Sequence, residues 1–310
     1  MTTSTHTSDV ASSSSAPLVA QRRFWPMWSA FTLGVFADNM LRQALLIGIP
    51  FGFIALPGVS AGVGVPIIGA LFAVAMLTFS SIAGQVADKY ETAAMLRRTK
   101  LVEVCIMAVA ALGFLLNSGH LLVLALFAMG AQSAFFSPVR IGAMPKYFET
   151  NELIRANAFF SAGLFVAILS GLTIGGMLIT HESGRTSVAG LLFGAAFIGW
   201  LFSRKAPPAA ATAPDLKLDW NIFRQGREVL GYAFGSPGVV RPMLGFGLFY
   251  YISTFVTVFV TVYAPNALGA DQNVTNIIMA LFTFGAGVGA ISASALAKGR
   301  SGLGFSTLGI

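Results

Sequence analysis

The sequence predicts an all-α protein, a polytopic bundle of helices that cross a membrane. Of its 310 residues, 55% are hydrophobic and 10% are charged, whereas soluble domains carry about 25% charged residues. The mean hydropathy is +0.77, and apolar residues gather in runs of about 20, the length of helix that spans a hydrocarbon core of about 30 Å. This composition excludes an ordinary soluble domain.

Eight apolar runs are predicted to span the membrane as helices, because a helix satisfies its own backbone hydrogen bonds in lipid. The third and the sixth runs are the shortest of them. The runs comprise residues 24–56, 63–87, 101–116, 121–139, 153–180, 187–202, 243–265 and 275–297. A ninth run begins at residue 302 and reaches residue 310, so we expect the start of a ninth helix and a chain that is truncated at its C-terminus.

The basic residues fall almost entirely on one side of these predicted spans. Of the 19 Lys and Arg residues, only Arg185 lies on the opposite side and only Arg42 lies deep within a span. Basic loops stay in the cytoplasm, so the N-terminus is predicted to be cytoplasmic. We interpret the net charge of +7 as membrane topology rather than as a nucleic-acid surface, because nucleic-acid binders gather their basic residues on a polar face.

The longest polar gap divides the predicted spans into two unequal groups. The resulting regions are a disordered cytoplasmic tail (residues 1–23), an N-terminal six-helix bundle (24–203), a cytoplasmic linker (204–242) and a partial C-terminal bundle (243–310). The tail is rich in Ser and Thr, which is typical of disorder. Two bundles joined by a linker are typical of transporters built from repeated halves.

The linker itself has two parts. Residues 206–214 are rich in Ala and Pro and are expected to be extended or flexible. The second part holds four apolar residues at helical spacing: Trp220, Phe223, Leu230 and Phe234. This pattern fits a helix on the membrane surface and, equally, a solvated helix packed on the bundle.

Two ionisable residues, Asp38 and Arg42, lie within the first predicted span. They are four residues apart and therefore share one helical face, with Asn39 beside them. Ionised groups deep in a membrane are costly unless they face protein or water, which indicates a substrate or coupling site in the bundle interior. Gln132 in the fourth span is assigned to the same site. The alternative is a self-neutralising pair that only holds helices together.

Other charged residues lie near the ends of the spans. Arg140 and Lys146 follow the fourth span, where they are placed to guide an anionic headgroup, although topology alone also puts cations there. Glu103 comes three residues after Lys100 near the start of the third span. These two residues are expected to form a structural ion pair at the membrane interface.

Glycine pairs at a spacing of four indicate close helix contacts in lipid. One pair, Gly171 and Gly175, lies in the fifth span, and another, Gly285 and Gly289, lies in the eighth. Packing is the expected role of both pairs.

The sequence shows no pattern typical of an enzyme. His120 and His181 are isolated, and Cys105 is the only cysteine. Neither a disulfide nor a cluster of metal ligands can be assembled from these residues. We therefore predict no catalytic residues, no metal and no cofactor.

The turn after the second span, Gly84-Gln85-Val86-Ala87-Asp88-Lys89, resembles the loop signature of the major facilitator superfamily. The resemblance implies a cytoplasmic gate, in which Gly84 allows close helix contact and Asp88 pairs with bases such as Arg97 and Arg98. Glu91 stands where the family usually has glycine. A basic loop that only sets topology is the alternative.

Several motifs in order resemble the lysophospholipid transporter branch of that superfamily, over residues 24–310. They are Phe36-Ala37-Asp38-Asn39, the turn at residues 84–88, Phe136-Ser137-Pro138-Val139-Arg140-Ile141-Gly142, and Ala280-Leu281-Phe282 with Gly285, Gly287 and Gly289. The resemblance implies a multi-pass protein of the bacterial inner membrane that moves lysophospholipid by alternating access. Its implied partners are membrane lipids and an acyltransferase, and not nucleic acid.

Arg42 suits a phosphate or a carboxylate, and Asp38 suits a proton, a cation or a substrate amine. Two other functions stay open. One is a proton-coupled efflux carrier for small amphiphiles, with Asp38 as its proton site. The other is a non-transporting membrane module that partners a lipid acyltransferase.

Overall fold

The computed structural model describes residues 18–56, 58–150 and 152–297, and every regular element in these residues is helical. Much of the predicted tail and the ninth apolar run (302–310) lie outside the described residues. After a short 3-10 turn, η1 (Leu18–Ala20), the helices are α1 (Phe24–Gly48), α2 (Ala61–Lys89), α3 (Thr92–Leu115), α4 (Gly119–Tyr147), α5 (Leu153–Leu178), α6 (Gly184–Ser203), α7 (Ile222–Phe234), α8 (Pro237–Leu268) and α9 (Gln272–Ala297).

Each predicted span corresponds to one helix, but the ends of the first and third spans were predicted wrongly. α1 ends at Gly48 and not at residue 56, because Pro50 lacks the N–H that would continue the helix and Gly52 turns the chain with a φ of 78°. α3 begins at Thr92 and not at residue 101. Glu91 caps its first turn by accepting two backbone N–H hydrogen bonds, and this stabilises a start that lies outside the apolar run.

The fourth and seventh spans are also longer than predicted. α4 continues to Tyr147 through Pro138 and Pro145, since a membrane helix tolerates proline where neighbouring groups satisfy the freed carbonyls. α8 begins at Pro237 and not at residue 243, because proline is well suited to the first turn of a helix. It ends at Leu268, and the next residue, Gly269, takes the left-handed conformation with a φ of 62°.

Five helices in the described part of the chain are long and apolar enough to cross a membrane: α2, α4, α5, α6 and α8. α1, α3 and α9 coincide with predicted spans but are not among these five in the described part of the chain. Charged residues within α1 and α3 lower the mean hydropathy of these two helices.

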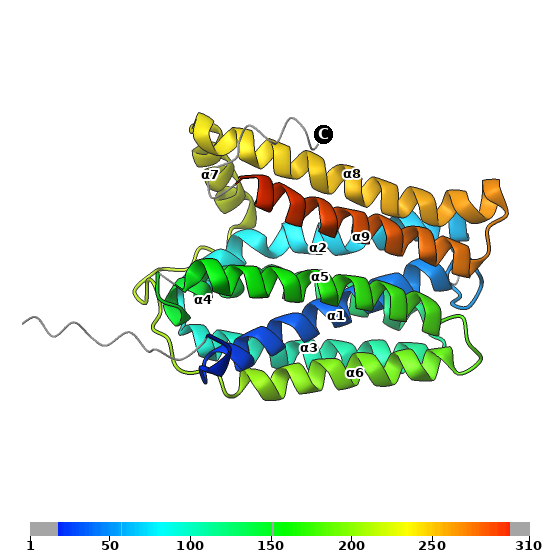
Figure 1. Ribbon diagram of the computed structural model, residues 1–310, viewed down its shortest axis with the longest axis horizontal. Coiled ribbons are helices and arrows are strands. Elements are labelled where there is room, and N and C mark those ends of the chain that lie inside the picture. Colours follow the sequence, from blue (N-terminus) through cyan, green and yellow to red (C-terminus); the bar gives the residue numbers. More distant parts are fainter. Residues whose placement is uncertain (1–17, 57, 151, 298–310) are drawn as a thin grey trace, which may run out of the picture.

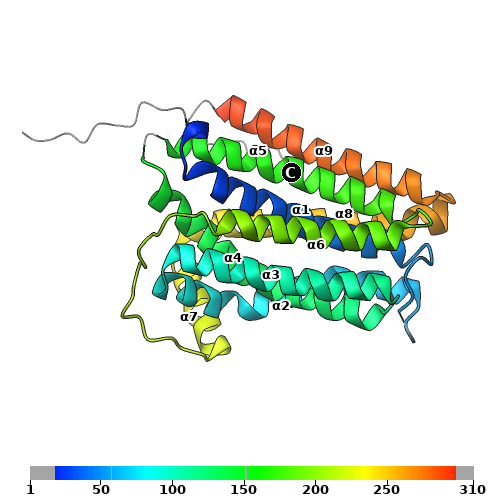
Figure 2. The ribbon, with the colours of Figure 1, turned by 90° about the horizontal axis from the view of Figure 1, so that it is seen from below.

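α1 to α6, α8 and α9 run in alternating directions along one common axis (Figure 1). α1 packs on α5 and α6, α2 packs on α4, and α3 packs on α4 and α6, so that α1 to α6 form one bundle. Beyond this bundle, α9 packs on α5, and α8 contacts α2 and α9. The linker and α7 lie at the end of the bundle where α2 ends and α3 begins (Figures 1 and 2). Most of the basic residues of the sequence lie at this end.

The two glycine pairs differ in their surroundings. Gly171 and Gly175 of α5 lie so close to α1 that a Cβ at either would be 2.6 Å from a carbonyl oxygen of that helix. Gly285 and Gly289 of α9 have nothing within 4 Å of the corresponding position among the described residues. The helix contact predicted for α9 at these two glycines is therefore not found.

We predict that Gly171→Ala destabilises the bundle, because the new methyl group meets backbone that cannot rotate away. Overpacking of this kind costs about 1–3 kcal/mol. Gly190→Ala in α6 is the matched control, since no atom lies within 4 Å of its added methyl group. Thermal unfolding in detergent measures both variants, and equal unfolding temperatures would contradict the α1–α5 contact.

Candidate functional site

The Asp38 and Arg42 side chains point to different partners. Asp38 Oδ2 accepts a hydrogen bond from Ser133 Oγ of α4 at 3.1 Å, and Arg42 Nη2 donates to Asn39 Oδ1 at 2.9 Å. Asp38 and Arg42 are not joined by an ion pair, although their charges act on each other. Asp38 Oδ1 and Arg42 Nε are both buried without a hydrogen bond to any described residue.

A complete ion pair lies inside the bundle next to these residues. Lys100 Nζ of α3 donates to Glu103 Oε2 at 2.7 Å, and the two side chains are 0% and 3% exposed. Gln132 Nε2 of α4 donates to the same Glu103 oxygen at 3.2 Å. The Lys100 ammonium also lies 4.6 Å from the centre of the Phe136 ring, and Gly34 of α1 leaves the space that the ammonium occupies.

The pair predicted between Lys100 and Glu103 therefore exists, and it is buried inside the bundle. Gly34 on α1 and polar groups on α4 make room for it in the core. Gln132 was assigned to the same site as Arg42, and the structure instead joins it to Glu103. The charges of Glu103 and Lys100 both act on Asp38, so the ion pair and the α1 residues belong to one electrostatic neighbourhood.

A polar contact between the two groups of spans was not predicted from the sequence. Gln43 Nε2 of α1 donates to Asn276 Oδ1 of α9 at 3.3 Å, and Asn276 Nδ2 donates to the Thr173 carbonyl of α5 at 3.4 Å. Asn276 fits against Gly176, where a larger residue would clash. In the sequence, only the presence of an amide side chain, Asn276, in an apolar run could have indicated this contact.

A cavity of about 540 Å³ lies between α1, α4 and α5. Its walls are largely apolar, and Arg140 is its one charged lining residue among those described. The Arg140 guanidinium lies 4.7 Å from the centre of the Phe31 ring and makes no hydrogen bond or ion pair with the described residues. The lining residues are Phe31, Arg140, Ile141, Met144, Pro145, Leu153, Asn157, Phe160, Ser161 and Leu164.

Arg140 and Arg42 share a neighbour on α8. Tyr250 interacts electrostatically with both guanidinium groups. Two cations from the N-terminal bundle therefore lie on the side that faces the C-terminal helices.

Lys146 does not line the cavity. Its Nζ donates to Thr92 Oγ1 and to the Ala210 carbonyl of the linker, each at 2.9 Å. The Tyr147 hydroxyl donates to the Pro207 carbonyl at 2.6 Å. The structure thus separates the two cations that were predicted to guide a headgroup, because Lys146 holds the linker instead.

Glu91 fixes the same stretch of the linker. Its carboxylate accepts from Ala209 N at 2.8 Å, and from the two N–H groups at the start of α3. Burial by itself would raise the pKa of Glu91, but the Ala209 N–H, the α3 N–H groups and the Arg97 charge together lower it below the ordinary value of 4.5. Residues 206–214 are extended as expected, but they are held to the bundle.

The predicted gate is only partly assembled. Arg97 Nη2 pairs with Glu91 at 3.4 Å and not with Asp88, whereas the Asp88 carbonyl accepts from Ala213 N of the linker at 2.8 Å. Arg98 is exposed and has no ion pair among the described residues, and no described atom lies within 4 Å of the position that a Cβ on Gly84 would take. Arg97, which was expected to pair with Asp88 in the gate, pairs with Glu91 instead.

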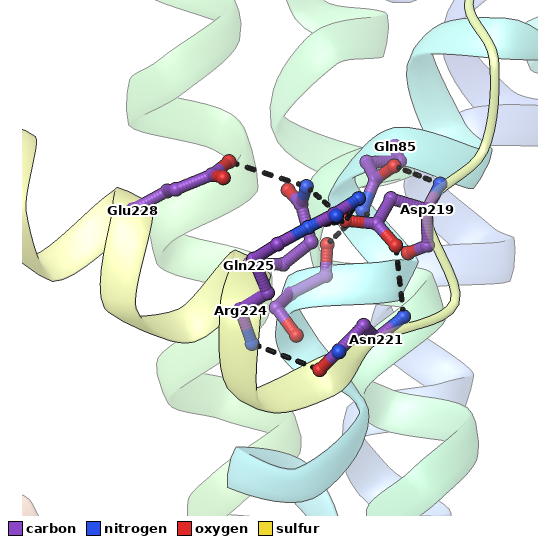
Figure 3. A network of polar contacts seen from close by, with 7 residues as sticks. Gln85, Asp219, Asn221, Arg224, Gln225 and Glu228 are labelled. Atoms are coloured by element: carbon purple, nitrogen blue, oxygen red, sulfur yellow. Dashed lines mark hydrogen bonds and ion pairs between the residues drawn. The ribbon is translucent and has the colours of Figure 1, made fainter.

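A second contact ties the linker to the end of α2. Gln85 Nε2 donates to the Asp219 carbonyl at 3.3 Å, and Gln85 Oε1 accepts from Asp219 N at 2.9 Å (Figure 3). The Asp219 carboxylate accepts from the side chains of Arg224 and Gln225 in α7. The Gln225 hydrogen bond, followed by the other donors, lowers the pKa of Asp219. The motif turn and the first turn of α7 are therefore one hydrogen-bonded unit.

Comparisons with known proteins agree with this architecture. The sequence profile of the Major Facilitator Superfamily matches residues 31–310. The lysophospholipid transporters LplT of Escherichia coli (strain K12 / DH10B) and of Shigella boydii serotype 18 (strain CDC 3083-94 / BS512) are each 27% identical to this chain over 271 residues. These residues are 85% of this chain and 64% of each relative, so the chain spans about 64% of their length. The predicted family resemblance is confirmed, and the chain is a multi-pass membrane protein.

We predict that either partner of the buried ion pair is costly to remove alone. Lys100→Met leaves Glu103 charged and unpaired in the core, which costs about 3–5 kcal/mol. The double variant Lys100→Met/Glu103→Met recovers most of this loss, because no unpaired charge is left. The free energy of unfolding in detergent tests this, with the exposed Arg98→Met as control. A double variant as unstable as Lys100→Met would contradict the pair.

We predict that Glu91→Gln loosens the linker, because the neutral side chain loses charge-assisted hydrogen bonds from backbone N–H groups. Tryptic cleavage at Lys217 should become about tenfold faster. Because the folded-state pKa of Glu91 is lowered, its contribution to the attachment of the linker is complete above pH 4.5. This contribution is lost as the pH falls through the lowered pKa. Glu149→Gln, an exposed acid on the neighbouring loop, should leave cleavage unchanged.

Proposed function

We propose that this chain, which belongs to the major facilitator superfamily, moves lysophospholipid across the bacterial inner membrane by alternating access. Two lines of support come from different sources. The similarity to lysophospholipid transporters covers 85% of the chain, and the cavity combines apolar walls with one uncompensated cation. Since the chain spans about 64% of those relatives, the activity is proposed for the protein at their full length.

The observation that carries the proposal is the chemistry of the cavity. A lysophospholipid has a phosphate, a polar headgroup and one acyl chain. An arginine with no anionic partner binds phosphate by paired, charge-assisted hydrogen bonds. Arg140 meets this requirement, and Phe31, Phe160 and Leu164 supply apolar surface for the acyl chain. Asn157 and Ser161 add uncharged polar groups beside the cation.

The α1 residues are assigned a complementary role in the same proposal. Arg42 Nε offers a second buried donor, and Asp38 Oδ1 offers a buried acceptor for a substrate amine, a cation or a proton. Gln132 acts through Glu103, to which it is hydrogen-bonded. Lys146 is removed from the headgroup assignment because the linker occupies its ammonium.

We further propose that the N-terminus lies in the cytoplasm. The basic residues gather at the end of the bundle that holds the beginning of α1, the linker and α7, and basic loops are retained on the cytoplasmic side. An acyltransferase that consumes the transported lysophospholipid is the proposed partner on that side, and this rests on the family resemblance alone.

One observation favours a second function. Asp38 has a buried oxygen without a hydrogen-bond partner among the described residues, which is what a proton site in an efflux carrier for small amphiphiles requires. Drug accumulation that follows a pH gradient, with no movement of lysolipid, would replace the first proposal with this one. Absence of both fluxes, with copurification of an acyltransferase, would favour a non-transporting module.

The proposal predicts that Arg140→Gln slows lysophospholipid transport by at least about tenfold, from the loss of charge-assisted hydrogen bonds. The measurement is uptake of fluorescent lysophosphatidylethanolamine into liposomes by a protein extended to the length of its relatives. Lys146→Gln is the matched control on the same helix and should keep normal uptake. Equal uptake by Arg140→Gln and the parent protein, at equal insertion, would overturn the role of Arg140.

A further inference from the structure

Helix α7 carries a row of large apolar side chains that the described part of the chain leaves uncovered. Phe223, Leu230 and Phe234 are 90%, 51% and 58% exposed. They are seven and four residues apart and therefore lie on one face of the helix. Trp220, just before α7, is also exposed. A contiguous apolar face of this kind marks an interaction surface.

The exposed row is not explained by a poorly attached helix. Ala233 is buried and Ile222 is half-buried, and α7 contacts both α2 and α8. At helical spacing these two residues lie about a quarter turn from the exposed row. The helix is therefore fixed to the bundle with a second apolar face left over.

Hydrogen bonds fix the rotation of α7 about its own axis. Asn221 caps the helix by accepting from Arg224 N at 3.0 Å. Asp219 accepts from the Arg224 and Gln225 side chains while its backbone pairs with Gln85 of α2 (Figure 3). Because this network joins the first turn of α7 to α2, the helix is held in the rotation that leaves the row exposed.

The position of α7 identifies what covers the row. Figure 1 shows α7 at the end of the bundle, running across the common axis of the membrane helices. Only Gly235 and Ser236 separate it from α8, which is long and apolar enough to span the membrane. The C-terminal end of α7 must therefore lie at the depth where α8 enters the bilayer.

The charges beside the row favour an anionic lipid surface. Arg227 lies next to the row on the helix and makes no hydrogen bond or ion pair with the described residues. The two nearby acids are already engaged, since Asp219 binds Arg224 and Glu228 accepts from Gln225. Each basic residue close to an anionic surface strengthens binding to it.

We propose that α7 is an interfacial anchor, whose Phe223, Leu230 and Phe234 enter the boundary between headgroups and acyl chains while Arg227 binds the phosphate of an anionic lipid. This site is separate from the cavity at Arg140, and it stands whether or not the chain transports lysophospholipid. Since α7 is joined to the motif turn of α2 through Gln85, the anchor holds that turn at the membrane surface.

The test places one fluorescent label on the full chain in liposomes. Cys105→Ser removes the only native cysteine, and an environment-sensitive probe is attached at Phe223→Cys or, on another face of α7, at Glu228→Cys. Leu77→Cys, which is 75% exposed on α2 within its apolar span, gives the signal of a probe in lipid. Quenching by lipids with spin labels on their acyl chains is measured in phosphatidylcholine vesicles with and without phosphatidylglycerol.

We expect the probe at position 223 to be quenched by lipid nearly as well as the probe at 77, and the probe at 228 to be quenched weakly. Phosphatidylglycerol should increase the docked population, and Arg227→Gln should reduce this gain about fivefold. Equal exposure of the probes at 223 and 228 to an aqueous quencher would overturn the proposal. A probe at 223 that is shielded from both water and lipid would also overturn it, because protein would then cover the row.

Discussion

The structure depends on the neutralisation of one positive charge, that of Lys100, inside the helix bundle. Lys100 is completely buried, and a charge in such a place is tolerated only with a partner and further hydrogen bonds. α3 supplies Glu103, α4 supplies Gln132 and the ring of Phe136, and α1 supplies the space at Gly34. Three helices must therefore meet in one register for the charge to be accommodated.

The same three-helix junction organises the candidate site. The charges of Lys100 and Glu103 act on Asp38 from one side, and Ser133 binds it from α4. Arg42 and Arg140 both interact with Tyr250 on α8. A change in the position of α8 relative to the bundle would thus alter the electrostatic surroundings of both cations. This is the property that a carrier with two alternating halves requires.

Much of the fold follows from the sequence, because each apolar run long enough to span a bilayer becomes a helix. Helix ends were less predictable, since α3 begins at a capping residue, Glu91, and not at a change in hydropathy. Partners were the least predictable. The spacing of Asp38 and Arg42 predicts that they share one face, but it does not predict the hydrogen bond of Asp38 with Ser133. The contact of Glu91 with Ala209 could not be predicted either, because the two residues lie far apart in the sequence.

The most direct test of the account is to find where lysophospholipid binds. A lysophosphatidylethanolamine with a photoreactive acyl chain is crosslinked to the protein in liposomes, and the labelled segments are identified by mass spectrometry. The account predicts labelling of α4 and α5 around Ile141, Phe160 and Leu164, which excess unlabelled lysophospholipid suppresses. Labelling confined to lipid-facing residues such as Leu77 and Leu124, unchanged by the competitor, would contradict it.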